Sequence, residues 1–210
     1  MANSPSDYPV QLSIDYPKRD LSRLTTFFRI FTLIPIVIIL GLLSGSSFGW
    51  ETPSSWDWQY ASSGIVVLPL ILMILFRKKY PTWWFDWNVA MTKFAMRVTA
   101  YCSLLDDVYP STDEEQSVHI KIAYPNVEKE LGRGMPLVKW LLAIPHFIVL
   151  AFLAVAVVFC IIISWFAILF NGRYPKSFFD FVVGVYRWGL RVEAYALIMT
   201  TDKYPPFSLE

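Results

Sequence analysis

The chain alternates between long apolar runs and short polar stretches. Three runs are nearly free of charge: 27–43, 60–76 and 137–170. At ~1.5 Å rise per residue, each of the first two runs is just long enough for a short membrane-spanning helix. Two shorter stretches, 10–16 and 118–124, alternate apolar and polar residues with the period of a half-buried strand. The pattern predicts a helical membrane protein with a minor two-strand element.

The third apolar run has two interpretations. As a single helix its 34 residues would extend ~51 Å, well beyond a ~30 Å hydrocarbon core. That helix would also place Arg173 and Lys176 on the opposite side of the membrane from Lys139. A hairpin of two short helices keeps these basic flanks on one side, although no Gly, Pro or Asn marks the turn. We favour the hairpin, with the single long helix as the alternative.

An aromatic and basic segment follows the second run at 83–105, and a similar one follows the third run at 177–200. In each segment two cations lie four residues apart and therefore share one helical face. The first segment has Lys93 and Arg97, and the second has Arg187 and Arg191. A cationic, aromatic-rich helix directly after a membrane exit is expected to lie in the cytoplasmic interface.

The two halves of the chain repeat one plan. A shift of 94 residues superimposes five short motifs of the two aromatic segments and of the residues just before them: Ile-Leu-Phe, Tyr-Pro, Phe-Asp, Arg-Val and Ala-Tyr. We therefore predict repeat one at 1–110, an acidic linker at 111–117 and repeat two at 118–210. The predicted fold is all-α, with two tandem repeats of a short transmembrane hairpin plus an amphipathic interfacial helix.

Composition and charge support this class. The chain is 55% hydrophobic and 17% aromatic, which is high for a soluble domain of 210 residues. Its net charge of +1 argues against a nucleic-acid partner. Basic residues flank the start of the first run and the end of the second, and the loop between them has none. The positive-inside rule then predicts a multi-pass protein with both termini in the cytoplasm.

No established catalytic or cofactor motif is present. The two cysteines and two histidines form no ligand cluster, so we predict no catalytic residue, cofactor or metal. His146 is the one histidine inside an apolar run, which makes it an intramembrane polar candidate, although a structural hydrogen bond near Pro145 is the more economical interpretation. Candidate contacts to lipid headgroups or to a partner are Lys93, Arg97, Arg187, Arg191, Trp83, Trp84 and Trp188.

The second half carries a set of short motifs. They include Ile144-Pro145-His146, Gly172-Arg-Tyr-Pro175, Phe179-Asp-Phe181 and Ala194-Tyr195, and the segment from Asp202 to Leu209. On these residues the chain resembles an uncharacterised bacterial membrane family, a domain of unknown function with the pattern RYP…FDF…RW…R…AY…YPPFSL. The resemblance implies a protein of the bacterial inner membrane and brings no activity or catalytic residue.

The functional prediction follows from membrane placement without recognisable chemistry. We expect a non-catalytic structural or accessory subunit of a larger bacterial membrane complex. Its expected partners are membrane lipids and other membrane-protein subunits or further copies of itself. The alternative is lipid-headgroup binding, or a component of lipid or small-molecule transport.

Overall fold

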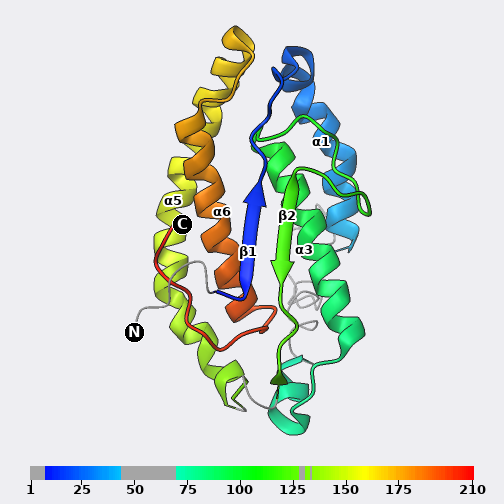
Figure 1. The fold of residues 1–210 in the computed structure, drawn as a ribbon, viewed down its shortest axis with the longest axis vertical. Helices are drawn as coiled ribbons and strands as arrows, with labels where there is room; N and C mark the ends of the chain where they lie inside the picture. Colours follow the sequence, from blue (N-terminus) through cyan, green and yellow to red (C-terminus); the bar gives the residue numbers. More distant parts are fainter. Residues whose placement is uncertain (1–7, 44–69, 128–130, 133) are drawn as a thin grey trace, which may run out of the picture.

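A computed structural model describes residues 8–43, 70–127, 131–132 and 134–210 (Figure 1). In chain order its elements are β1 (Val10–Ile14), α1 (Arg23–Leu43), a π-helical turn η3 (Met73–Arg77), α3 (Thr82–Cys102), β2 (Val118–Ile122), α5 (Met135–Asn171) and α6 (Lys176–Ala196). The described part of the chain is thus mostly helical with one small sheet, as the pattern predicts.

The two predicted strands pair with each other. β1 and β2 form an antiparallel sheet in which Leu12 lies opposite Ile120. Alternate side chains are buried, and the polar ones between them are exposed. This alternation is expected of an antiparallel sheet with one face on the core and the other in water. The prediction of a two-strand element is confirmed.

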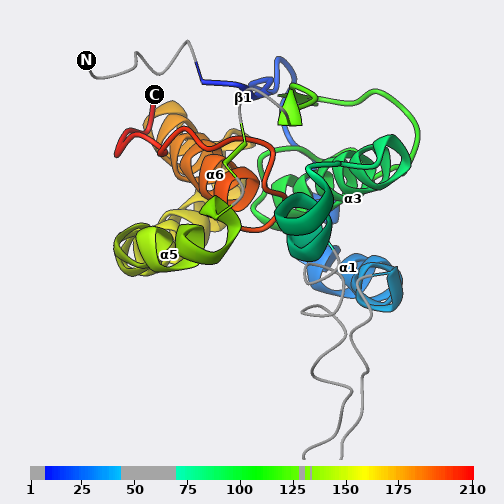
Figure 2. The same cartoon turned by 90° about the horizontal axis from the view of Figure 1, so that it is seen from below.

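The elements stack in three layers, which Figure 2 shows end-on. The sheet forms the first layer. The second layer holds α6, which packs on β1, and α3, which packs on β2. The third layer holds α5 behind α6 and α1 behind α3, and these two outer helices also contact each other. The main hydrophobic core lies between the sheet and the middle helices.

The region predicted as a hairpin is one continuous helix. α5 runs unbroken through 37 residues, so the favoured hairpin at 137–170 is wrong and the single-helix alternative is correct. The physical reason is the one that weakened the hairpin: no residue at the centre of the run favours a turn. Pro145 lies within the helix without ending it. The end comes at Gly172, whose φ of 75° is a left-handed conformation that glycine adopts readily.

Apart from the exposed end residues Arg23 of α1 and Asn171 of α5, the outer helices bury their most polar residues and expose many of their apolar ones. In α5 the three polar interruptions Lys139, His146 and Ser164 are fully buried, and in α1 Arg29 is buried. Only 11% of the most apolar window of α5 and 17% of that of α1 is buried within the molecule. A core helix of a soluble protein would be mostly buried. Both helices are long and apolar enough to cross a membrane.

The remaining predicted segments fall as follows. The first predicted span, 27–43, lies within α1. The second, 60–76, lies largely outside the described residues, and its described end is a helical turn continued by η3. The predicted interfacial helices at 83–105 and 177–200 correspond to α3 and α6. α6 is enclosed by α5 and β1, so much of its surface faces protein.

Candidate functional site

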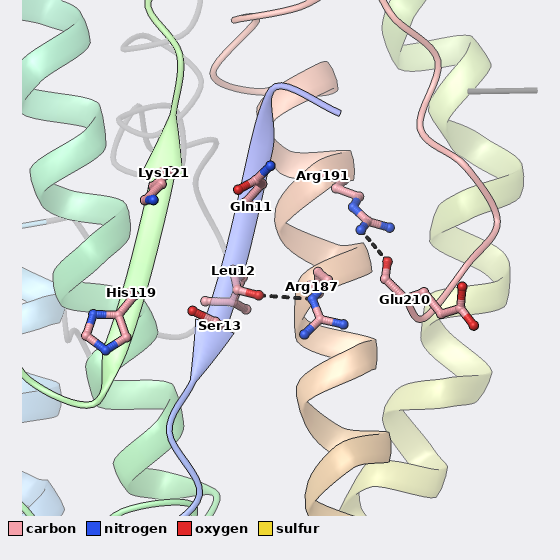
Figure 3. Close-up of a pocket in the computed structure, with 8 residues that line it drawn as sticks. All are labelled: Gln11, Leu12, Ser13, His119, Lys121, Arg187, Arg191 and Glu210. Atoms are coloured by element: carbon pink, nitrogen blue, oxygen red, sulfur yellow. Dashed lines mark hydrogen bonds between the residues drawn. The ribbon is translucent and has the colours of Figure 1, made fainter. Parts of the chain in front are cut away.

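A basic cavity opens where the sheet, α6 and the C-terminal segment (residues 197–210) meet. It has a volume of about 540 Å³. Three of its lining residues are cations, Lys121 from β2 and Arg187 and Arg191 from α6. Figure 3 shows the two arginines projecting from one side of α6 beside β1. Glu210 brings a carboxylate to the same rim, so the cavity is cationic but not uniformly so.

The arginines hold backbone as well as lining the cavity. Arg187 Nε donates to the carbonyl oxygen of Leu12 on β1 at 3.0 Å, and its Nη1 donates to that of Leu209 at 3.0 Å. Arg191 donates to the carbonyl oxygens of Ser208 and Glu210. The spacing of four residues, recognised in the sequence, thus fastens both β1 and the C-terminal segment to one side of α6 (Figure 3).

A close backbone approach makes this arrangement possible. Gly184 lies on α6 one turn before Arg187, where an added Cβ would come within 2.8 Å of the Leu209 carbonyl oxygen. Any larger residue would push the C-terminal segment away from the helix. Glycine is used here because it lets two backbones approach, and this need outweighs its poor helix propensity.

Burial and like charge both act on the deeper arginine. Arg191 is almost completely buried. Burial, followed by the adjacent positive charge of Arg187, lowers the pKa of Arg191 from its usual value. An anion placed in the cavity would relieve this repulsion between the two guanidinium groups. The two guanidinium groups and the Lys121 ammonium thus give this part of the cavity a positive lining.

The predicted cations of α3 are separated by the structure. Lys93 lines an adjoining opening of about 490 Å³ that also contains Lys121. Arg97 is buried and donates from Nη1 to the Ser111 carbonyl oxygen at 2.8 Å. It fastens the loop after α3 much as Arg191 fastens the C-terminal segment. Headgroup contact by Lys93 and Arg97 stays a prediction.

The predicted tryptophans differ in exposure. Trp83 is 62% exposed and meets the partly buried Trp84 edge-on, with ring centroids 5.2 Å apart. Trp188 is buried and faces α5, where its Nε1 donates to Nδ1 of His146 at 3.1 Å. His146 also stacks on Phe207 at 4.0 Å between centroids. The structural interpretation of His146, a hydrogen-bonded residue near Pro145, therefore matches its surroundings.

A buried ion pair escaped the sequence analysis. Lys139 Nζ lies 2.7 Å from Oδ1 of Asp202, and it also donates to the Thr201 carbonyl oxygen at 2.7 Å. The side chain of Lys139 is fully buried, whereas that of Asp202 is 18% exposed. The pair fastens the C-terminal segment to the start of α5. In the sequence Lys139 interrupts an apolar run, and nothing there pairs it with a residue 63 positions away.

The geometry of this region supports binding and anchoring. In the described ranges, no three His, Cys, Asp or Glu side chains gather closely enough to form a metal site. The residues that converge are arginines, lysines and backbone carbonyls, which bind anions or fasten segments of chain. What distinguishes this region chemically is its cationic cavity.

Comparison with known proteins gives one match. No curated protein and no solved structure is similar enough to the chain to be matched. A family model described as a domain of unknown function (DUF4389) matches residues 135–208. The match occurs once and covers α5, α6 and most of the C-terminal segment, so it does not show a second copy in the first half. The chain carries a DUF4389 domain of unknown function at residues 135–208.

Proposed function

We propose that this chain is a non-catalytic membrane protein that serves as a structural or accessory subunit of a larger complex in the bacterial cytoplasmic membrane. The observation that carries the proposal is the inverted burial of α1 and α5. Away from their ends, both helices turn their polar residues toward the protein and their apolar residues outward, as helices in contact with lipid or with another membrane protein do.

The inner polar contacts of α1 and α5 support a permanent arrangement. Arg29 of α1 donates from Nη1 to the Tyr101 carbonyl oxygen at 2.6 Å and lies over the Tyr101 ring. On α5, Lys139 and His146 have the partners described above. Because these polar side chains lie inside the molecule, the outward surface of both helices is apolar away from the helix ends. Such a surface needs a covering of lipid or protein.

Two further parts of the proposal concern the repeat and the sides of the membrane. The antiparallel pairing of β1 with β2, and the packing of each strand on a middle helix from the other half of the chain, are compatible with tandem copies of one unit. Basic residues that flank the apolar segments support a cytoplasmic location for both termini.

The accessory role is tested by purification from native membranes. The tagged full chain is extracted in a mild detergent, and co-purifying proteins are quantified by mass spectrometry. We expect at least one membrane protein in a fixed stoichiometry, reproduced when the tag is moved to the other terminus. A protein that survives an alkaline carbonate wash of the membranes but purifies as a monomer with no companion would refute the accessory role and leave the membrane location standing.

A second candidate function, the binding of an anionic group, is favoured by the cavity between Lys121, Arg187 and Arg191. The ligand would be a phosphate, free or as part of a lipid headgroup. Lys121→Ala is the variant of choice, because the arginines also hold β1 and the C-terminal segment. Lys203→Ala, at an exposed lysine that does not line this cavity, is the matched control.

Two probes distinguish the sources of phosphate. Inorganic phosphate is titrated by calorimetry, and vesicles with and without phosphatidylglycerol are tested by co-sedimentation. If Lys121→Ala weakens the binding of free phosphate several-fold, the ligand is soluble. If Lys121→Ala weakens only the binding to vesicles that contain phosphatidylglycerol, the ligand is a lipid headgroup. Equal binding by the parent chain, Lys121→Ala and Lys203→Ala would eliminate this function.

A further inference from the structure

The molecule as a whole is amphipathic across its three layers. The outward face of the sheet is polar and carries the exposed side chains of Ser13, Asp15, His119 and Lys121. On the opposite side α1 and α5 form an apolar layer, which Figure 2 shows beyond the middle helices. Large exposed side chains of this apolar layer include Phe28, Phe31 and Ile34 of α1, and Phe152, Phe159 and Phe166 of α5.

The length of α5 argues against an upright crossing. Thirty-seven residues at ~1.5 Å each give a helix of ~55 Å, while the hydrocarbon core is ~30 Å thick. To fit, the helix would have to tilt by roughly 57° from the bilayer normal, beyond the ~0–40° range of membrane-spanning helices. No charged residue lies on its outward face to mark where an upright helix would leave the hydrocarbon.

The neighbours of α5 give a second, independent argument. Trp188 on α6 binds His146 on α5, and the adjacent Arg187 binds Leu12 at the centre of β1. The centres of β1 and α6 therefore lie beside α5, and all three run along the long axis of the molecule (Figure 1). An upright α5 would draw the polar sheet face into the membrane with it. Each charged residue near the bilayer centre costs at least ~2.5 kcal/mol.

The basic residues at the two ends of α5 give a third argument against an upright crossing. Arg173 and Lys176 follow its end, and both are exposed. Near its start lies η3, since Ile74 and Leu131 share one hydrophobic cluster, and η3 is followed by the exposed Lys79. An upright helix would place these two groups on opposite sides of the membrane. A helix lying along the membrane lets both reach the anionic headgroups of one leaflet.

We infer that the apolar layer of α1 and α5 lies along a single leaflet, with its occupant the acyl chains of that leaflet, and that the sheet faces the cytoplasm. In this geometry the cavity beside Lys121 opens away from the bilayer and would take a free phosphate rather than a headgroup of the same leaflet. The inference rests on the membrane location proposed above and specifies its geometry. It replaces the multi-pass arrangement for α1 and α5, and it satisfies without a hairpin the charge asymmetry that made a hairpin attractive. The layer enters the bilayer to about the depth of one helix, ~10 Å.

Sidedness at the helix ends is the first arm of the test. Lys79→Cys and Lys176→Cys, at exposed positions near the two ends of α5, are made separately in the full chain, on a background in which Cys102 and Cys160 are replaced by serine. The purified protein is reconstituted into sealed vesicles of phosphatidylethanolamine and phosphatidylglycerol. A membrane-impermeant maleimide is then added outside. Within one orientation of the protein, established by protease protection of a terminal tag, both positions should be labelled from the same side; labelling from opposite sides would overturn the inference.

Depth along the helix is the second arm, because a hairpin would also keep both ends on one side. Spin labels at Leu141→Cys, Phe152→Cys and Phe166→Cys report depth through their relative exposure to oxygen and to a water-soluble nickel complex. A helix lying in the leaflet gives three similar depths of about 5–10 Å. A profile deepest at Phe152, near ~15 Å, would overturn the inference. Ala143→Cys, at a buried position facing α6, should be shielded from both reagents.

Different results would refute the accessory role and the leaflet geometry. Loss of the protein from vesicles or from carbonate-washed membranes would refute the membrane location and the leaflet geometry together. Failure to recover a stoichiometric partner would refute only the accessory role, since the labelling uses purified protein without a partner.

Discussion

Removing either member of the Lys139–Asp202 pair should have very different effects. The ammonium of Lys139 is fully buried, and its neighbours are the Asp202 carboxylate, the Thr201 carbonyl oxygen and the Tyr195 ring, whose centroid is 5.2 Å away. Asp202 is partly exposed and also accepts a hydrogen bond from the Gly132 amide at 2.6 Å. Only the lysine therefore depends on its partner to compensate its charge.

The magnitude follows from this asymmetry. Breaking a buried ion pair so that a charge is left behind costs ~3–5 kcal/mol. For Asp202→Asn we expect the lower end, ~3 kcal/mol, because the asparagine oxygen still accepts a hydrogen bond from Lys139. Lys139→Met removes the buried charge with an unbranched chain and leaves a carboxylate that water and Gly132 can stabilise, so it should cost only ~1 kcal/mol. The double variant should resemble Lys139→Met.

The assay is thermal unfolding of the purified chain in detergent micelles at neutral pH, followed by tryptophan fluorescence. A difference of ~2 kcal/mol corresponds to a Tm for Asp202→Asn that is lower than that of Lys139→Met by about 4–8 °C. Lys176→Met is the matched control, since its ion pair with Asp180 is exposed and should contribute less than ~1 kcal/mol. If Lys139→Met were as destabilising as Asp202→Asn, the assignment of the dependent charge to the lysine would be wrong.

For three other substitutions the structure sets the direction of the expected effect. Gly184→Ala should lower the free energy of unfolding by ~1–2 kcal/mol, because the new Cβ displaces Leu209. Gly189→Ala is the control: nothing lies within 4 Å of its new Cβ, so it should raise the free energy of unfolding by ~0.5–1 kcal/mol. Equal effects of the two variants in denaturant titrations would contradict the close approach of Leu209 to Gly184. Burial raises the pKa of Glu193 despite a hydrogen bond with Thr92, so the fold favours the protonated carboxyl. The stability that the protonated Glu193 contributes is complete below its unfolded-state pKa and is lost as pH rises through its folded-state pKa. Glu193→Gln should therefore reduce the fall in Tm between these two pKa values. An unchanged Tm–pH profile would exclude a contribution of Glu193 to the pH dependence of stability.

The local elements were predictable because each has a short-range cause. Period-two alternation placed both strands, and the end of the apolar run at residue 170 placed the end of α5. The enclosure of α6 was not predictable in this way. Its aromatic and basic residues are equally compatible with a membrane interface and with contacts to β1, α5 and the C-terminal segment. Only the tertiary arrangement distinguishes the two.

The candidate site was predicted in part. The pairing of Arg187 with Arg191 on one helical face follows from their spacing, and both residues line the cavity. Their backbone acceptors lie on β1 and in the C-terminal segment, and no local pattern connects those segments to α6. Lys121 was missed for a similar reason, since a lysine on the exposed face of a strand usually indicates nothing more than contact with water.

The sequence contains a spacing of polar residues that favours a single helix over a hairpin at 137–170. The same spacing bears on how the protein contacts the membrane. Lys139, His146 and Ser164 are separated by 7 and 18 residues, which are close to two and five turns of an uninterrupted α-helix. Three polar residues on one stripe indicate a single helix with one protein-facing side, because a turn in the middle would break their alignment. All three are buried on the side facing the protein, and the rest of the circumference is apolar. A helix with so narrow a polar stripe and so long an apolar surface is suited to lying along a leaflet, with the stripe on α6 and the remaining sides in acyl chains.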